Sequence, residues 1–164
     1  RAAHADDAPP AAPAPSQHPG VGGHFGVAVP LVFIRSENPP GNQTVGDQFT
    51  LAFPIGIGFS LTDKVALDLE TIVGNPISPR GTTGVTIDPG IVYNAGPVVL
   101  GGRLGWDIGA PTNFKLIPLI HRAVANVGAG ANWFVEAAFP ITFDFPPGKT
   151  TTELDIVFHT GIGF

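Results

Sequence analysis

The sequence predicts an all-β fold, an eight-stranded antiparallel up-and-down transmembrane β-barrel preceded by a Pro/Ala-rich tail. Large apolar residues alternate with small or polar ones in eight segments, with the period of two that is typical of β-strands. Charged residues make up only 13% of the chain, which contains 22 Gly and 18 Pro. This composition argues against long helices and against a charged surface exposed to water.

The charge balance and the lack of cysteine exclude several classes of function. A net charge of −5 provides no basic surface for nucleic acid. The chain contains no Cys, which excludes disulfides and thiolate zinc sites. It also lacks a run of about 18 apolar residues, the length that a membrane-spanning helix needs. A chain of this kind can therefore span a membrane only as a closed barrel.

Residues 1–20 differ in composition from everything that follows, so we expect a tail over 1–20 and a barrel domain over 21–164. Ala3-His4-Ala5 has the small-x-small form of a signal-peptidase site, which predicts that residues 1–5 are the remnant of an export signal. Residues 8–19 are rich in Ala and Pro and predict a disordered, extended linker. The alternative for this tail is a docking arm for a partner.

The hairpin over residues 49–73 shows most clearly which face of the barrel points outward. Its two strands join at Thr62-Asp63-Lys64, and each has one face of Phe, Leu, Ile and Val. The other face carries Gly, Ala and Ser together with Asp68 and Glu70. The interior of an eight-stranded barrel is only just wide enough for side chains to fill. We therefore expect the bulky apolar face to point outward, where lipid tolerates it and water does not.

The same alternation recurs along the chain and predicts eight strands. They cover residues 23–34, 49–61, 65–73, 84–94, 98–108, 115–127, 133–145 and 154–164. In the first strand Leu31 and Phe33 belong to the outward row. In the sixth strand the phase set by Ile117 and Leu119 is disturbed at His121-Arg122, and a bulge there would explain the disturbance.

The connections alternate in length, as they do in membrane barrels with long outer loops and short turns. The longer connections are 36–46, 75–83, 109–114 and 146–152, and the shorter ones are 62–64, 95–97 and 128–132. Outward-facing aromatic residues gather at both ends of the strands and predict two aromatic belts at the lipid headgroups. The short-turn belt is Phe25, Phe59, Tyr93, Trp133 and Phe164, and the long-loop belt is Phe33, Phe49, Trp106 and Phe143.

From residue 22 to 164 the chain resembles the small eight-stranded outer-membrane β-barrels of Gram-negative bacteria, of the OmpA-transmembrane and OmpX type. The resemblance rests on this architecture and on the alternating segment 154–164, which closes on Phe164. It implies a location in the bacterial outer membrane, contact with outer-membrane lipid, and a role for Phe164 as a signal to the barrel-assembly machinery. Gly56-Ile57-Gly58-Phe59 matches Gly161-Ile162-Gly163-Phe164, and a shared need for small lumenal residues beside an outward Phe accounts for this.

The inward faces carry most of the charged residues of the barrel. The predicted lumenal charge network is Asp68, Glu70, Asp88, Arg103, Asp107, Arg122, Glu136, Asp144 and Asp155. Sequestered charges need partners, so we expect a network of salt bridges and water that fills and stiffens the lumen. Because carboxylates outnumber guanidinium groups, a narrow cation-preferring passage is the alternative.

Other residue types with chemical potential lack a recognisable motif. His24 and His159 face inward on the first and last strands, which must pair to close the barrel, but their spacing carries no metal-ligand signature. Ser60, Glu70 and His121 supply the residue types of an esterase, without a Gly-x-Ser-x-Gly elbow. The sequence therefore predicts no catalytic site, no metal and no cofactor.

The sequence favours a structural or interaction role, in which loops 36–46 and 75–83, or tail residues 6–20, contact a protein partner. One alternative is the narrow cation-preferring pore, and a related one is a conduit for small hydrophobic molecules. A lipid-modifying enzyme and a soluble secreted β-barrel are less favoured alternatives.

Overall fold

The structure is a computed structural model that describes residues 20–36, 41–109 and 113–164. The expected tail over 1–19 lies outside the described residues. The strands are β1 (Val21–Arg35), β2 (Gly41–Thr44), β3 (Phe49–Ser60), β4 (Val65–Ser78), β5 (Gly84–Asn94), β6 (Val99–Asp107), β7 (Asn113–Gly128), β8 (Ala131–Ala138), β9 (Ile141–Asp144) and β10 (Thr151–Gly163). No helix in the described part of the chain is long and apolar enough to cross a membrane.

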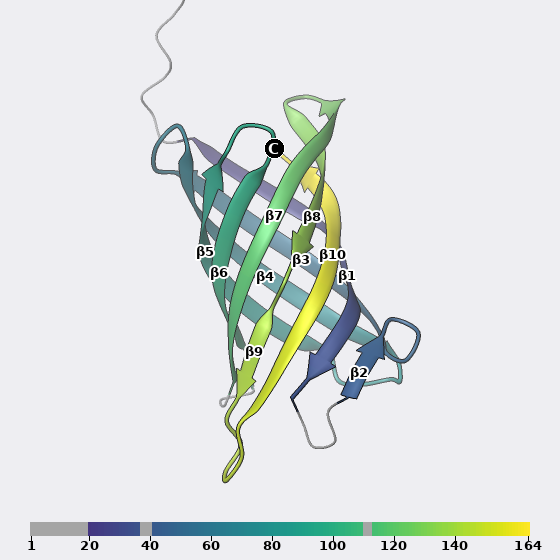
Figure 1. Ribbon diagram of the computed structural model, residues 1–164. Coiled ribbons are helices and arrows are strands. Elements are labelled where there is room, and N and C mark those ends of the chain that lie inside the picture. Colours follow the sequence, from purple (N-terminus) through teal and green to yellow (C-terminus); the bar gives the residue numbers. More distant parts are fainter. Residues whose placement is uncertain (1–19, 37–40, 110–112) are drawn as a thin grey trace, which may run out of the picture.

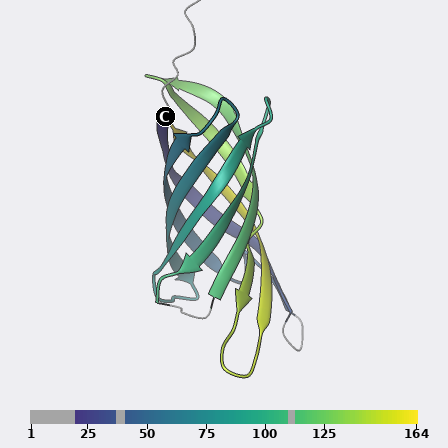
Figure 2. The same cartoon turned by 90° about the vertical axis from the view of Figure 1, so that its left-hand side faces the viewer.

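The strands form one closed antiparallel sheet, and the tilted wall of this barrel is visible in Figures 1 and 2. From β3 to β8, strands that follow one another in sequence pair side by side, β1 pairs with β3, and β1 also pairs with β10 to close the barrel. β8 and β9 are one strand interrupted at Phe139-Pro140, since both lie between β7 and β10. β2 pairs with residues 32–35 of β1, beyond residues 21–28 of that strand, which pair with β3. The predicted eight-stranded barrel is therefore confirmed.

The direction of the two faces follows the prediction. Phe53, Ile55 and Leu69 are 42%, 59% and 42% exposed on the outside of the wall. Asp68 and Glu70, which alternate with apolar residues in β4, are 5% and 2% exposed and face the lumen. A water-soluble barrel would show the opposite arrangement, because its apolar side chains would fill the interior.

The short turns lie at the end of the barrel where Figure 1 marks the C-terminus, and the β9–β10 hairpin projects from the opposite end. Two predicted loops are shorter than expected. β4 continues to Ser78, so the predicted loop 75–83 is reduced to residues 79–83. Within the predicted loop 36–46, Gly41–Thr44 forms β2, and residues 37–40 lie outside the described residues.

The predicted outward position of Phe33 is wrong. The pairing of β1 with β10 shifts between Pro30 and Val32, where Leu31 is an extra residue. This bulge reverses the alternation, because a shift of one residue moves every following side chain to the other face. Phe33 is consequently 4% exposed and lines the lumen, so it does not belong to the long-loop belt.

The assignment of Arg122 to the lumen is also wrong. Pairing between β6 and β7 ends at Val99 and His121, and β7 then continues past the end of β6 as a hairpin with β8. Arg122 lies in this extension and is exposed. The irregularity expected in this strand is present slightly later, as register shifts between Ala123 and Ala125 and between Asn126 and Gly128.

Candidate functional site

Arg103, on β6, is the centre of a buried cluster of charges that crosses the lumen. Its Nε and Nη2 lie 2.8 and 2.7 Å from Oδ2 of Asp68. Its Nη1 donates to Glu70 Oε1 at 3.1 Å and to Glu136 Oε1 at 3.3 Å, so that β4, β6 and β8 are joined across the barrel. We call Asp68, Glu70, Asp88, Arg103 and Glu136 the Arg103 cluster. The fork of guanidinium donors suits this role, because one planar group serves several carboxylates at once.

Three histidines extend the cluster. His24 Nε2 lies 2.5 Å from Glu70 Oε2, and His159 Nδ1 lies 3.3 Å from Glu136 Oε1. His121 Nδ1 is 3.6 Å from Glu136 Oε2. The His24 ring lies directly over Gly56, where a Cβ atom would collide with it. Gly56 is thus needed for His24 to reach Glu70.

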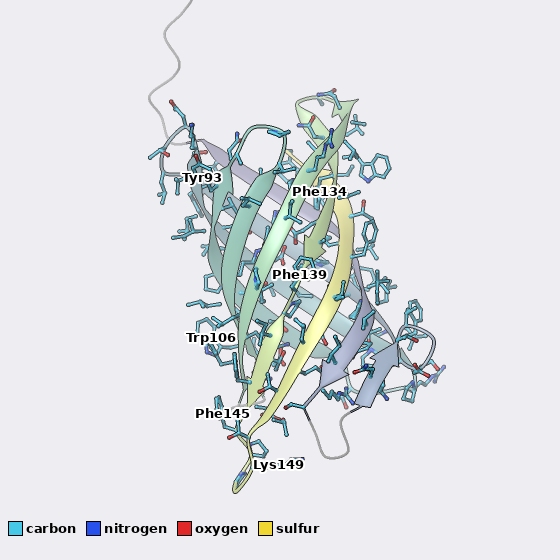
Figure 3. The ribbon with its side chains drawn as sticks, in the orientation of Figure 1. Tyr93, Trp106, Phe134, Phe139, Phe145 and Lys149 are labelled. Carbon is cyan, nitrogen blue, oxygen red and sulfur yellow. The ribbon has the colours of Figure 1, made fainter. Side chains whose placement is uncertain are left out.

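Phe134 packs beside these histidines. It is 1% exposed, and its ring centroid lies 4.5 Å from that of His121 and 4.9 Å from that of His159. The His24 and His159 rings are 6.0 Å apart and both contact this aromatic ring or its edge. The interior of the barrel at this level is therefore narrowed by an aromatic ring and charged side chains. Figure 3 labels Phe134 within the upper part of the barrel.

Asp88 is the member of the Arg103 cluster that no basic side chain of the described residues contacts. It faces Glu70 across the β4–β5 pairing and is completely buried. Neither of its carboxyl oxygens receives a hydrogen bond from an N–H or hydroxyl group of the described residues, and its carboxyl group lies against that of Glu70, with which it can share a proton. A buried carboxyl group that faces another carboxyl group and no cation is uncommon.

The other predicted lumenal charges lie nearer the long-loop end. Asp107 accepts hydrogen bonds from Lys115 Nζ at 2.8 Å, from Asn113 Nδ2 at 2.5 Å and from the Thr86 hydroxyl. Asp155 faces Phe33 across the seam, and its Oδ1 is buried without a partner among the residues described. Asp144 lies at the rim, beside the ion pair between Arg35 and Glu153.

Two chambers lie on either side of this central cluster, and a third space of about 200 Å³ lies within it, beside Arg103 and Leu119. The loop-side chamber has a volume of about 380 Å³ and extends from the Arg103 cluster toward the long loops, with Ala28, Ile72, Ile117 and Val157 in its wall. The turn-side chamber has about 350 Å³ and is lined by residues that include His24, Asn132 and Phe134. His24 and Phe134 stand between the turn-side chamber and the Arg103 cluster.

The residue types of an esterase do not come together. Ser60 is exposed beside the short turn, whereas Glu70 is buried in the centre of the barrel and bonds to His24. His121 contacts Glu136 instead. Within residues 20–36, 41–109 and 113–164, no group of three or more His, Cys, Asp or Glu side chains is arranged to hold a metal ion.

Most of the predicted belt residues lie on the outer surface. Phe25, Phe59, Tyr93, Trp106, Trp133 and Phe164 are exposed, and Phe49 and Phe143 are partly exposed. Figure 3 shows Tyr93 near the short-turn end and Trp106 near the long-loop end. Phe114 was not predicted, yet it lies between Trp106 and Phe143, with ring centroids 5.7 and 6.5 Å away. The Trp133 indole donates to Thr160 Oγ1 at 2.7 Å.

A wall of exposed Phe, Ile, Leu and Val around a lumen of buried charges is stable only where the wall meets lipid. The protein is a membrane β-barrel. No protein-family model matches it, and no curated protein matches its sequence. Among solved structures, the barrel is similar to the crystal structure of Neisserial surface protein A (NspA), at 12% identity and a TM-score of 0.50, over 87% of this chain and 95% of that one.

Two designed proteins also match. The solution structure of the de novo designed TMB2.3 matches at 10% identity and a TM-score of 0.46, over 90% of this chain and 95% of that one. A second de novo designed transmembrane β-barrel matches at 14% identity and a TM-score of 0.42, over 87% and 98%. At this level of identity the likeness to the Neisserial protein supports the barrel fold and leaves the function to be argued from the site.

Proposed function

We propose that this protein is a non-conducting barrel of the bacterial outer membrane, with a structural or interaction role carried by its long-loop end. The observation that supports this proposal is the way the Arg103 cluster and Phe134 cross the lumen. Together with His24, His121 and His159, these side chains bridge opposite walls by direct contact. A network of this kind stiffens a barrel and narrows the route of an ion to a space of about 200 Å³ beside Arg103 and Phe134.

The narrow cation-preferring pore is less well supported. A selective passage needs charged groups that an ion can reach and leave. Asp68, Glu70 and Glu136 instead bond to Arg103 and are almost fully buried. Displacing them would break several charge-assisted hydrogen bonds for each ion that passes.

The long-loop end offers surfaces for a partner. Figure 1 shows the β9–β10 hairpin and β2 at this end, and Figure 3 places Lys149 at the tip of the hairpin. Residues 79–83 lie in the connection between β4 and β5 and are exposed. Loops held by a rigid wall can vary in sequence without disturbing the fold, which makes them the usual place for recognition.

Conductance in planar lipid bilayers tests the closed lumen. We expect no single-channel steps from the wild-type barrel, and steps from a double variant, Arg103→Ala with Phe134→Ala, that removes the filling. Trp133→Ala is the matched control, because Trp133 neighbours Phe134 but points outward, and it should stay silent. Reproducible steps from the wild-type protein would refute the proposal.

Labelling on intact cells tests the location and the orientation. The chain has no Cys, so one cysteine can be introduced at a time. We expect a membrane-impermeant maleimide to label Lys149→Cys at the long-loop end and to leave Asp63→Cys on a short turn unlabelled until the cells are opened. The reverse pattern would show that the loops face the inside and cannot contact an external partner.

A further inference from the structure

We propose that the loop-side chamber is a binding site for a compact apolar molecule with a primary amine, whose ammonium group is received by Asp88. This inference does not depend on the interaction role of the loops. It rests on the shape of the chamber, on the chemistry of its wall and on the position of Asp88, whose carboxyl group faces Glu70 and no basic side chain of the described residues.

The chamber has the size and the wall of a ligand site. Its volume of about 380 Å³ lies within the range of small-molecule pockets, roughly 300–1,000 Å³. Most of the wall is apolar and is formed by Pro30, Phe33, Pro54, Ile72, Ile117 and Val157. Proline and branched side chains have few rotamers, so this wall is preformed and a ligand loses little free energy in ordering it. An apolar body of matching size would gain from contact with it.

The charge at the inner end of the chamber selects the polar group of the ligand. The Arg103 cluster contains four carboxyl groups and one guanidinium group. Asp68, Glu70 and Glu136 each contact Arg103, whereas Asp88 faces the carboxyl group of Glu70 and no cation of the described residues. A cationic donor would complete this group, whereas an anionic ligand would be repelled. An ammonium group has three N–H donors, enough for both oxygens of Asp88.

Other acidic groups of the chamber are less suitable. Asp107 is already bonded to Lys115, Asn113 and Thr86. Asp155 lies nearer the loop end, where Glu153 is its hydrogen-bond partner and where Lys115 and Arg35 already supply positive charges. Because the Asp88 carboxyl group is fully buried, binding requires neighbouring side chains to move aside far enough for one ammonium group to touch it. A bare metal ion would leave the apolar wall unused.

The test compares two probes that differ only in the polar group, 1-adamantylamine and 1-adamantanol. Binding to the barrel in lipid nanodiscs is measured by calorimetry, with empty nanodiscs as the background. We expect saturable binding of one amine per barrel, and binding of the alcohol that is about tenfold weaker. Equal binding of the two probes, or no saturable binding above the background, would overturn the proposal.

Matched variants locate the site. Gly74 lines the chamber and Gly102 lies on the outer face, and a Cβ atom at either position meets no atom within 4 Å. We expect Gly74→Phe to abolish amine binding and Gly102→Phe to leave it unchanged. Binding that survives Gly74→Phe would place the amine elsewhere, in the lipid or on the surface, and would refute the site.

The carboxyl group is tested by Asp88→Asn, with Asp155→Asn as its control. We expect Asp88→Asn to weaken amine binding by about tenfold and to remove the preference for the amine over the alcohol, and Asp155→Asn to change the affinity by less than about threefold. If Asp88 shares a proton with Glu70 and is neutral, Asp88→Asn will have no effect, and the assignment of the ammonium site is then wrong. Heat-modifiable gel migration checks that each variant is folded.

Discussion

The replacement Arg103→Met is the sharpest test of what the charges in the lumen contribute to stability. It keeps much of the length and apolar volume of the side chain and removes the cation from three buried carboxylates. Removing one partner of a buried ion pair typically costs about 3–5 kcal/mol, because the other charge is left uncompensated. We expect a loss in the free energy of unfolding of that size, with a smaller loss for Arg103→Lys, which keeps the charge but not the fork of donors.

The measurement is a urea titration of the barrel in lipid vesicles, followed by tryptophan fluorescence. Arg80→Met is the control, since Arg80 is exposed in the connection between β4 and β5, and we expect a change within about 0.5 kcal/mol. In a double variant with Asp68→Asn, the loss should be smaller than the sum of the two single losses, because the two residues share one contact. A loss below about 1 kcal/mol for Arg103→Met would show that the cluster does not stabilise the barrel.

Three further predictions use the same titration. Ile55→Arg places a charge on the lipid face near the middle of β3 and should lower the free energy of unfolding by about 2–4 kcal/mol, while Val45→Arg in a turn should leave it almost unchanged. Equal effects of the two substitutions would contradict the lipid-facing assignment of Ile55. Gly161→Ala puts a methyl group against the backbone of Phe25 and Gly26, where β1 and β10 close the barrel, and should lower the free energy of unfolding by about 1–3 kcal/mol. Gly102→Ala should not lower it. If Gly161→Ala has no effect either, the packing between β1 and β10 is looser than the structure shows. Thr160→Val removes both the acceptor of the Trp133 indole and the donor to the Phe134 carbonyl, and it should lower the free energy of unfolding by about 1–2 kcal/mol, whereas Thr71→Val on the outer face should not destabilise the barrel. No difference between them would show that these two hydrogen bonds do not stabilise the barrel.

The barrel and the direction of its faces could be predicted because both follow from the period of two in the sequence. A strand that alternates bulky and small residues has only two possible orientations, and the narrow lumen permits one of them. The alternation also places Phe134 on the inward face, because its neighbours Trp133 and Val135 belong to the outward row. It does not reveal which side chains Phe134 contacts. The short turns were equally predictable, since Thr62-Asp63-Lys64 interrupts the alternation.

The partners within the cluster could not be predicted, because they depend on the register of strands far apart in sequence. Arg103 bonds to residues 33 and 35 positions away, and no local pattern encodes such a pairing. The position of Phe33 was missed for a different reason, because a bulge changes the phase without changing the composition. Pro30 in mid-strand was an available signal, since proline within a sheet is mostly found at edges and bulges.

The prolines explain how a lumen this narrow can hold a chamber. Pro30 adjoins the bulge in β1, and Pro140 lies in the gap between β8 and β9. The pairing of β1 with β3 skips from Phe25–Ile55 to Ala28–Ala52 around Pro54. Pro76 adjoins the register shift between β3 and β4. Each proline lacks an N–H donor, so each weakens the wall locally.

These four prolines all line the loop-side chamber, and their rings take the place of longer side chains that would fill it. If only stability mattered, residues with a backbone N–H would complete the ladder of hydrogen bonds at these positions. An unpaired backbone polar group costs more free energy in a membrane than in water. The turn-side chamber has no proline in its lining, although the pairing of β7 with β8 beside it also shifts register, between Ala123 and Ala125 and between Asn126 and Gly128. The four prolines are thus gathered where an open, apolar and preformed space results, which favours a chamber that has a function over one left by imperfect packing.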